Sequence, residues 1–159
     1  TAVFSQPGAY TLRLTASDGL LTRSAEVMVY AQDTPASWLA ARPGIGGLED
    51  DPDGDGRSNY LEYALQTDPR APQAAAPPVI GFEDGRQSLV FTRLTPPGPV
   101  TYAVQISTDL ASWRLPNPGE INEEILSSDG FTQTIKFTDT VAVGAGGPRY
   151  LRVRMISVP

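Results

Sequence analysis

Acidic residues alternate near the middle of this chain, in the stretch DPDGDGRSNYLE. Asp51, Asp53 and Asp55 take the first, third and fifth positions of a twelve-residue frame, with Gly56 at the sixth and Glu62 at the twelfth. A glycine at the sixth position permits a sharp turn, so the alternate carboxylates converge on one point. Hard divalent cations take about six to eight oxygen ligands. The pattern therefore predicts an EF-hand-like calcium loop that binds Ca²⁺.

The remaining positions complete the predicted ligand set. Arg57, at the seventh position, is expected to offer its backbone carbonyl while its charged head points away. Asn59 takes the ninth position, which usually acts through water, and Glu62 closes the shell with a bidentate carboxylate. The predicted metal ligands are Asp51, Asp53, Asp55, Arg57, Asn59 and Glu62.

A solvated acidic turn is the alternative interpretation, because Pro, Gly and Asp are also good turn residues. The residues that follow favour the calcium loop. Residues 59–65 predict a short exit helix with Leu61 and Leu65 on one face. Ser58 stands where paired loops carry an aliphatic residue, and the sequence holds no second loop. We therefore predict a single structural calcium site.

Composition narrows the classes of function. The chain has no cysteine and no histidine, a single lysine, and a net charge of −6. These absences exclude disulfides, thiolate nucleophiles, serine–histidine triads and ordinary zinc sites, so we do not expect an enzyme. The negative charge disfavours nucleic acid and anionic lipid as partners. No apolar run approaches the roughly 20 residues of a membrane span, so membrane insertion is not expected.

Carboxylate pairs remain as conceivable catalytic groups. The acidic cluster at residues 49–55 is assigned to calcium. Glu123 and Glu124 fall in a polar stretch that we interpret as solvated charge between strands. The glycine-rich residues 143–148 lack the lysine of a phosphate loop and are interpreted as a flexible hairpin tip.

Residues 1–32 alternate in the manner of strands, with a turn at Asp18 and Gly19. The stretch FSQPGAYTLRLTASDGLLTRSAEVMVY resembles the last three strands of a PKD or related immunoglobulin-like repeat. Such a sandwich needs about seven strands, so the missing ones are expected from upstream sequence or from another chain. The apolar positions of the alternation are Tyr10, Leu12, Leu14, Val27 and Val29.

Residues 33–73 form the predicted calcium-binding connector, followed by a Pro/Ala linker at residues 74–78. A short helix is expected at residues 35–41, ended by Pro43 and Gly44. We expect Trp38 on this helix to pack in a core rather than to serve as a sugar platform. Its predicted neighbours are Tyr60, Tyr63 and Leu65.

Residues 79–159 alternate again and predict an antiparallel β-sandwich of six or seven strands, similar in size to a fibronectin type III domain. Its first strands, at residues 79–82 and 88–94, flank a polar turn. Trp113 is expected to be mostly buried against Tyr102 or Val104. The fold class is therefore mainly β, with a partial immunoglobulin-like sandwich, a short helical calcium segment and a C-terminal sandwich.

The order of these motifs resembles the C-terminal region of large secreted proteins of environmental bacteria such as Verrucomicrobia and Planctomycetes. The likeness rests on the calcium loop with its Glu-Tyr ending, the Pro/Ala linker, YAVQISTDLASW at residues 102–113 and YLRV at residues 150–153. It implies a secreted, extracellular or bacterial cell-surface location, with any export signal upstream of Thr1. The resemblance implies no particular activity.

We therefore expect a non-catalytic, calcium-stabilised accessory region that serves adhesion, spacing or anchoring. Its expected partners are upstream domains or a second copy of the chain, with a glycan or cell-surface polymer as a further candidate. One alternative is a carbohydrate-binding module, whose candidate aromatic residues are Phe82, Phe91, Tyr102, Trp113 and Tyr150. The other is a secretion or sorting domain that a transporter recognises through Arg149, Arg152 and Arg154.

Overall fold

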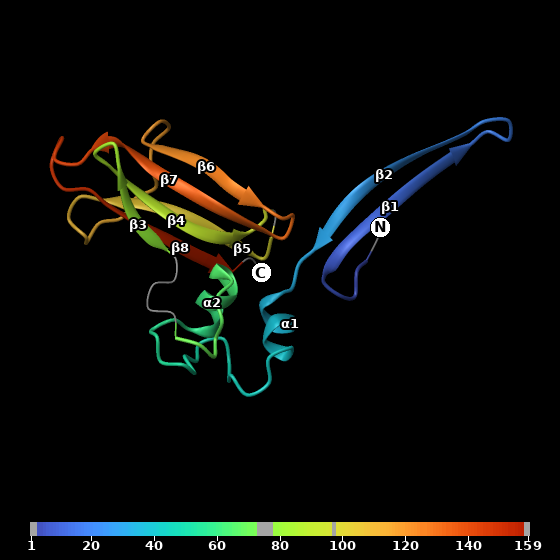
Figure 1. Ribbon diagram of the computed structural model, residues 1–159, viewed down its shortest axis with the longest axis horizontal. Helices are drawn as coiled ribbons and strands as arrows, with labels where there is room; N and C mark the ends of the chain where they lie inside the picture. The colour runs from blue at the N-terminus through green and yellow to red at the C-terminus, as the bar shows by residue number, and fades with distance from the viewer. Residues whose placement is uncertain (1–2, 73–77, 97, 158–159) are drawn as a thin grey trace.

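The computed structural model describes residues 3–72, 78–96 and 98–157, which form a mainly β protein with two short helices (Figure 1). All strand pairings in these residues are antiparallel, so the predicted fold class is confirmed. The strands are β1 Gly8–Ser17, β2 Thr22–Ala31, β3 Val79–Glu83, β4 Arg86–Leu94, β5 Val100–Ser107, β6 Ile121–Ser128, β7 Thr132–Ala142 and β8 Tyr150–Ser157. The helices are α1 Pro35–Ala40 and α2 Asn59–Leu65.

Strands β3 to β8 form the predicted C-terminal sandwich. One sheet has the order β3-β4-β7-β6, and the second pairs β5 with β8. Alternate side chains of β4 and β7 face the second sheet, so they are buried while their neighbours are more exposed. Each large apolar side chain buried in this way contributes about 1.5–3 kcal/mol. The strand residues of this core are Leu89, Phe91, Val104, Ile106, Ile135, Phe137 and Leu151.

The turn between β3 and β4 has the chemistry that its sequence predicts. Asp84 and Gly85 are its two central residues, with φ angles of 49° and 70°. Two consecutive positive φ values match the twist of antiparallel strands, and Asp-Gly is a preferred pair for such a turn. The pairing places Phe82 opposite Gln87, so both side chains lie on the same face of the hairpin.

Strand β6 corrects the interpretation of Glu123 and Glu124. These residues lie within a strand and not between strands. Both are exposed, as expected of solvated charge, and they pair with Arg93 and Lys136 at 3.0 Å each. The strand was missed because β6 is a sheet edge with almost every side chain exposed, so its sequence shows no apolar alternation.

The glycine-rich residues 143–148 also differ from their prediction. They join β7 to β8, which belong to different sheets, so they form a crossover between sheets and not a hairpin tip. Gly144, Gly146 and Gly147 have φ angles of 85°, 80° and 97°. These left-handed conformations are nearly cost-free for glycine, which lets the chain turn sharply from one sheet to the other.

The N-terminal segment forms two strands among the described residues, not the three that were predicted. Strands β1 and β2 make a long hairpin that extends away from the sandwich (Figure 1). Residues 3–7 fold back on β1 instead of forming a strand. The Tyr10 hydroxyl donates to the Gln6 carbonyl at 2.8 Å, and the Phe4 ring packs 4.4 Å from the Tyr10 ring.

The hairpin has one apolar face, which the other parts of the described chain leave largely uncovered. Leu14 is 75% exposed and Val27 is 58% exposed, although Leu12 and Val27 are directly paired across the strands. The interactions found between the hairpin and the sandwich within the described ranges lie at the hairpin base. The Tyr30 and Phe131 rings pack edge to face there, with their centroids 5.1 Å apart.

The two helices follow the hairpin in the chain and lie below the sandwich in the view of Figure 1. Thr34 caps α1 by accepting from the Ser37 backbone, and the helix ends at Ala40, one residue before its predicted end. Trp38 is buried, and its ring centroid lies 5.7 Å from that of Tyr63, which confirms the prediction that it packs in a core. Neither helix in the described chain has the length and apolar character to cross a membrane. Residues 73–77 lie outside the described residues, and these include most of the predicted linker.

Candidate metal centre

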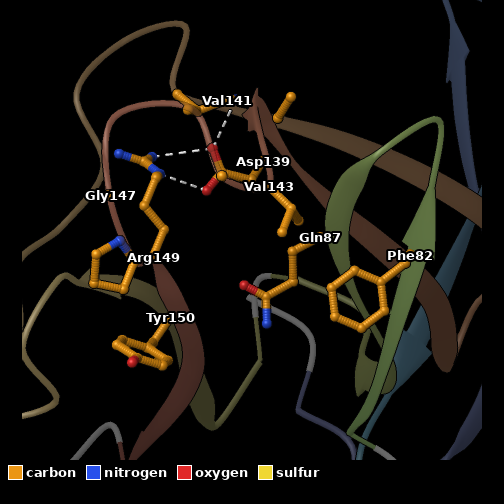
Figure 2. Close-up of a pocket in the computed structure, with 11 residues that line it drawn as sticks. Phe82, Gln87, Asp139, Val141, Val143, Gly147, Arg149 and Tyr150 are labelled. Carbon is orange, nitrogen blue, oxygen red and sulfur yellow. Dashed lines mark hydrogen bonds and ion pairs between the residues drawn. The ribbon is translucent and has the colours of Figure 1, made fainter.

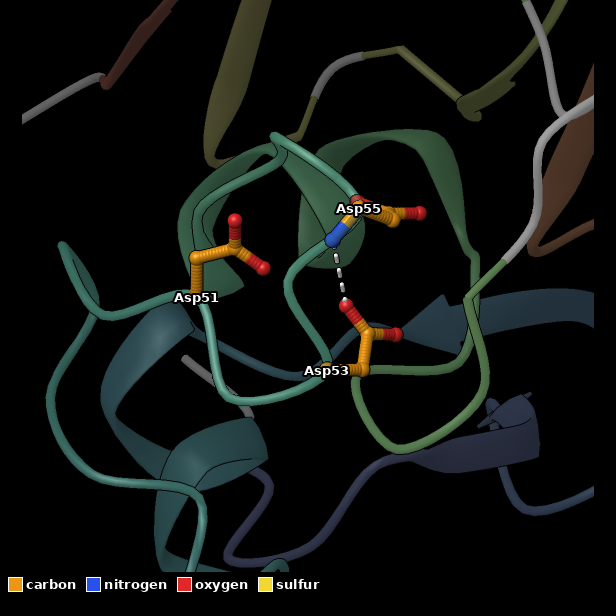
Figure 3. A group of neighbouring side chains, drawn as sticks. All are labelled: Asp51, Asp53 and Asp55. Carbon is orange, nitrogen blue, oxygen red and sulfur yellow. Dashed lines mark hydrogen bonds between the residues drawn. The ribbon is translucent and has the colours of Figure 1, made fainter.

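Three aspartates of the predicted loop converge in the structure. Ligand oxygens of Asp51, Asp53 and Asp55 all lie within 4.8 Å of one another (Figure 3). The loop is wound by its own carboxylates, since the two oxygens of Asp51 accept from the backbone nitrogens of Gly54 and Gly56, each at 2.9 Å. Gly56 has a φ of 89°, which explains why the sixth position needs glycine.

Glu62 projects from α2 and is completely buried. Its Oε1 accepts a long hydrogen bond of 3.4 Å from Thr67, and its Oε2 has no partner among the described residues. Burial, together with the charges of Asp53 and Asp55, raises the pKa of the Glu62 carboxyl to about 7. The carboxyl of Glu62 is therefore close enough to Asp53 and Asp55 to be affected by their charges.

Asn59 braces the loop through hydrogen bonds to residues that precede it in the chain. Its completely buried amide nitrogen donates to the carbonyls of Ile45 and Gly47 at 2.8 and 2.7 Å. Two carbonyl acceptors fix which end of the amide faces them, so Oδ1 points to the other side. That oxygen is buried and accepts nothing from the part of the chain that the structure describes. Asn59 was predicted as a ligand through water, and its bracing role was missed.

Unsatisfied oxygen atoms gather at this loop. Besides Asn59 Oδ1 and Glu62 Oε2, the buried Oδ2 of Asp53 lacks a hydrogen-bond partner within the described ranges. Proteins seldom bury acceptors without partners, because each such group costs roughly 1–3 kcal/mol. Oxygens that lack donors are the ligands that a hard cation satisfies.

Arg57 contradicts its prediction. The guanidinium turns toward the loop and places Nη1 2.6 Å from Asp55 Oδ2. The expectation that the charged head points away is therefore wrong. Clustered carboxylates attract the nearest cationic side chain, and the stem of Arg57 is long enough to reach.

Helix α2 connects this loop to both of its neighbours. The Tyr63 hydroxyl donates to the Asp33 carbonyl at 2.6 Å, just beyond the end of β2. On the sandwich side, the Tyr102 hydroxyl donates to the Ala64 carbonyl at 2.6 Å. Leu65 at the end of the helix belongs to the sandwich core. Sequence patterns identified these apolar positions but not the two tyrosine hydrogen bonds.

A second direct contact holds the hairpin base on the sandwich. The amide nitrogen of Gln32 donates to the carbonyls of Thr95 and Phe131 at 2.9 and 3.1 Å. Gly130 lies beneath Tyr30, and any side chain at this glycine would clash with the ring. The hairpin is thus attached through α2 and through this contact.

The sandwich carries a cavity of about 250 Å³ near the crossover loop (Figure 2). Asp139 and Arg149 form a bidentate ion pair at its edge, at 2.7 and 3.0 Å. In Figure 2 the Phe82 ring and the Gln87 amide lie next to each other, and Tyr150 also lines the cavity. Phe82 is 69% exposed, which is unusual for a ring of this size.

The other predicted aromatic residues do not form a flat exposed strip. Phe91 is completely buried, and the Tyr102 hydroxyl is engaged by α2. Trp113 is half-buried, with the guanidinium of Arg152 lying 4.2 Å from its ring centre. Trp113 is thus partly buried, with Arg152 packed on its ring, and its expected contact with Tyr102 or Val104 stays a prediction.

Two of the three arginines of the sorting alternative are engaged within the fold. Arg149 pairs with Asp139, and Arg152 both stacks on Trp113 and donates to Gln105 at 2.8 Å. Arg154 is exposed. Arg152 is also exposed, so Arg149 is the one of the three that is partly buried.

Comparison of the chain with protein-family models, curated proteins and solved structures gave no match.

Proposed function

We propose that this chain is a non-catalytic accessory region of a larger secreted or cell-surface protein, and that one calcium ion fixes the hairpin relative to the sandwich. The buried, unpartnered oxygens of Asp53, Asn59 and Glu62 carry this proposal. A calcium ion would supply the positive charge that these oxygens lack. The residues that would hold the ion are the aspartates of the loop together with Asn59 and Glu62.

The position of α2 explains how one ion would affect two neighbours. Glu62 lies on this helix, directly before Tyr63 and Ala64, which are hydrogen-bonded toward the hairpin and the sandwich. Two like charges 4 Å apart repel by about 4 kcal/mol at an effective dielectric constant of 20. Calcium would relieve such repulsion and hold α2 in place, which would stiffen both attachments.

A secreted location fits this role. Calcium sites of extracellular modules have dissociation constants of about 10⁻⁴ to 10⁻³ M, so they are occupied at the millimolar calcium concentration outside cells. Because the chain has no cysteine, no disulfide can cross-link it, and a bound metal ion can supply the stabilisation that disulfides give other small proteins. Spacing or anchoring of neighbouring domains is the function that such a stiffened connector serves.

Calorimetry tests the proposal directly. One calcium ion should bind per chain, and Asp53→Asn and Glu62→Gln should each abolish binding at millimolar calcium. Glu49→Gln is the matched control, because Glu49 is an exposed acid just before the loop. Chelator should also increase proteolysis within residues 45–66. Equal binding by the Glu62→Gln variant, or no calcium uptake by the native chain, would contradict the proposal.

A second candidate function is binding of a neutral glycan at the cavity of the sandwich. The exposed Phe82 ring beside the Gln87 amide favours it, because sugars stack on aromatic rings and bond to planar amides. Retention of the chain on an insoluble polysaccharide should then be lost in Phe82→Ala and kept in Trp113→Ala. Loss in Trp113→Ala alone would place the binding surface elsewhere.

A further inference from the structure

Asp55 and Arg57 occupy the fifth and seventh positions of the loop, and the two oxygens of Asp55 have different partners. Oδ1 accepts from the backbone nitrogen of Arg57 at 3.0 Å. Oδ2 accepts from the Arg57 guanidinium at 2.6 Å. The side chains are 5% and 18% exposed, so water screens this ion pair only weakly.

These two hydrogen bonds have different consequences for a metal. The backbone bond to Oδ1 is part of the turn that brings the carboxylates together. Oδ2 is then the oxygen of Asp55 that remains for an ion, and a guanidinium already holds it. We infer that Arg57 is a built-in competitor for calcium, which must leave Asp55 Oδ2 before this oxygen can bind the ion. This inference rests on the proposed function.

Arg57 stabilises the metal-free form of the loop and destabilises the calcium-bound form. In the metal-free loop, Arg57 brings a permanent positive charge to the carboxylates, because a guanidinium is never deprotonated in proteins. It therefore stabilises the metal-free form. In the calcium-bound form the same charge is released from its partner and still lies near a divalent cation, which lowers calcium affinity. Arg57 thus sets the site to a weaker affinity than its carboxylates alone would give.

Arg57→Gln removes the charge and keeps most of the side-chain stem. We expect the dissociation constant for calcium to fall about tenfold, which corresponds to about 1.4 kcal/mol. The metal-free variant should be less stable than the native chain and should be cleaved faster within the loop. Arg57→Lys keeps the charge but loses the planar fork, and its calcium affinity should lie between those of Arg57→Gln and the native chain.

Arg70→Gln is the matched control. It makes the same change in net charge in the same connector, but Arg70 donates to the Pro43 carbonyl and not to a loop carboxylate. Its calcium affinity should stay within about twofold of the native value, as expected for a screened charge outside the loop.

Calcium titration of the full chain by calorimetry, with proteolysis as a second readout, separates the outcomes. Unchanged or weaker calcium binding by Arg57→Gln, with normal binding by the native chain, would overturn the role of Arg57 and leave the calcium site intact. Failure of every variant to bind calcium would refute the proposed function itself. If metal-free Arg57→Gln is unfolded, recovery of its native circular dichroism on addition of calcium supports the inference, and failure to recover it contradicts it.

Discussion

The hairpin and the sandwich both contain strands with alternating apolar residues, but the apolar residues are buried only in the sandwich. Leu12 and Leu14 alternate in β1 just as Leu89 and Phe91 alternate in β4. Phe91 is completely buried between two sheets, whereas Leu14 is 75% exposed on a ribbon without a second layer. Alternation therefore predicts that a strand will have an apolar face, but not that the chain supplies something to cover it.

The buried core therefore stabilises the sandwich, whereas the hairpin has no such core. A two-stranded hairpin alone is marginally stable, and its order depends on what holds its base. Here the base is attached by Gln32, Tyr30 and the bond from Tyr63 to Asp33. The connector is thus the element through which the sandwich can order the hairpin.

The largest expected effect contrasts the two apolar faces. Phe91→Ala should lower the free energy of unfolding by about 3–5 kcal/mol, because it opens a cavity in the core. Leu14→Ala should change it by less than about 0.5 kcal/mol, as expected for an exposed site. Chemical denaturation measures both. A loss above about 1 kcal/mol for Leu14→Ala would mean that another chain covers this face in solution.

The connection between α2 and the sandwich gives the second effect. Tyr102→Phe removes a hydroxyl that donates to the Ala64 carbonyl and accepts from the Leu94 nitrogen at 3.1 Å. Leaving these groups unpaired should cost about 1–3 kcal/mol. Tyr150→Phe is the control, because the Tyr150 hydroxyl has no hydrogen bond among the described residues. Equal losses in thermal denaturation would show that the bond to α2 is not what matters.

The hairpin base gives the third effect. Gly130 and Gly19 have similar φ angles of 93° and 91°, and only Gly130 faces a neighbouring ring. Alanine at either site should cost about 1–2 kcal/mol for the left-handed backbone. Gly130→Ala should in addition displace Tyr30 and weaken hydrogen-exchange protection at the end of β2. Equal protection in the two variants would mean that the Tyr30 contact does not order the hairpin.

Much of this fold was predictable because its signals are local. The alternation of β4, the Asp-Gly turn at residues 84–85 and the extent of α2 follow from patterns of side chains close in sequence. Strand β6 was not predictable in this way, since its order comes from pairing with β7. The third N-terminal strand failed for the converse reason, because the residues before β1 pack on Tyr10 instead.

In the candidate site, too, the features set by local sequence were predictable and those set by more distant residues were not. The spacing of Asp51, Asp53 and Asp55 predicted their convergence, because a twelve-residue loop is a local structure. The bracing by Asn59 depends on carbonyls at Ile45 and Gly47, which no loop pattern includes. The inward turn of Arg57 depends on the total charge of the site and not on its position in the pattern.

The smallest expected effect concerns the loops of the sandwich, where Glu120 accepts two bonds from Arg114 at 2.6 and 2.7 Å. This pairing, with a further bond from the Asn117 backbone, lowers the pKa of the Glu120 carboxyl to about 2. A carboxyl with a lower pKa in the folded state stabilises the fold above its unfolded pKa of about 4.5, and this contribution is lost as the pH falls toward 2. Denaturation of the native chain and Glu120→Gln across this range should therefore show a steeper acid loss in the native chain. Because the pair is partly exposed, the difference should be much smaller than that between Phe91→Ala and Leu14→Ala. If the free energy of unfolding falls with pH equally in both proteins, Glu120 does not keep its ion pair with Arg114 in solution. The loops of the sandwich would then be loosely ordered like the exposed hairpin, and only the core would be well ordered.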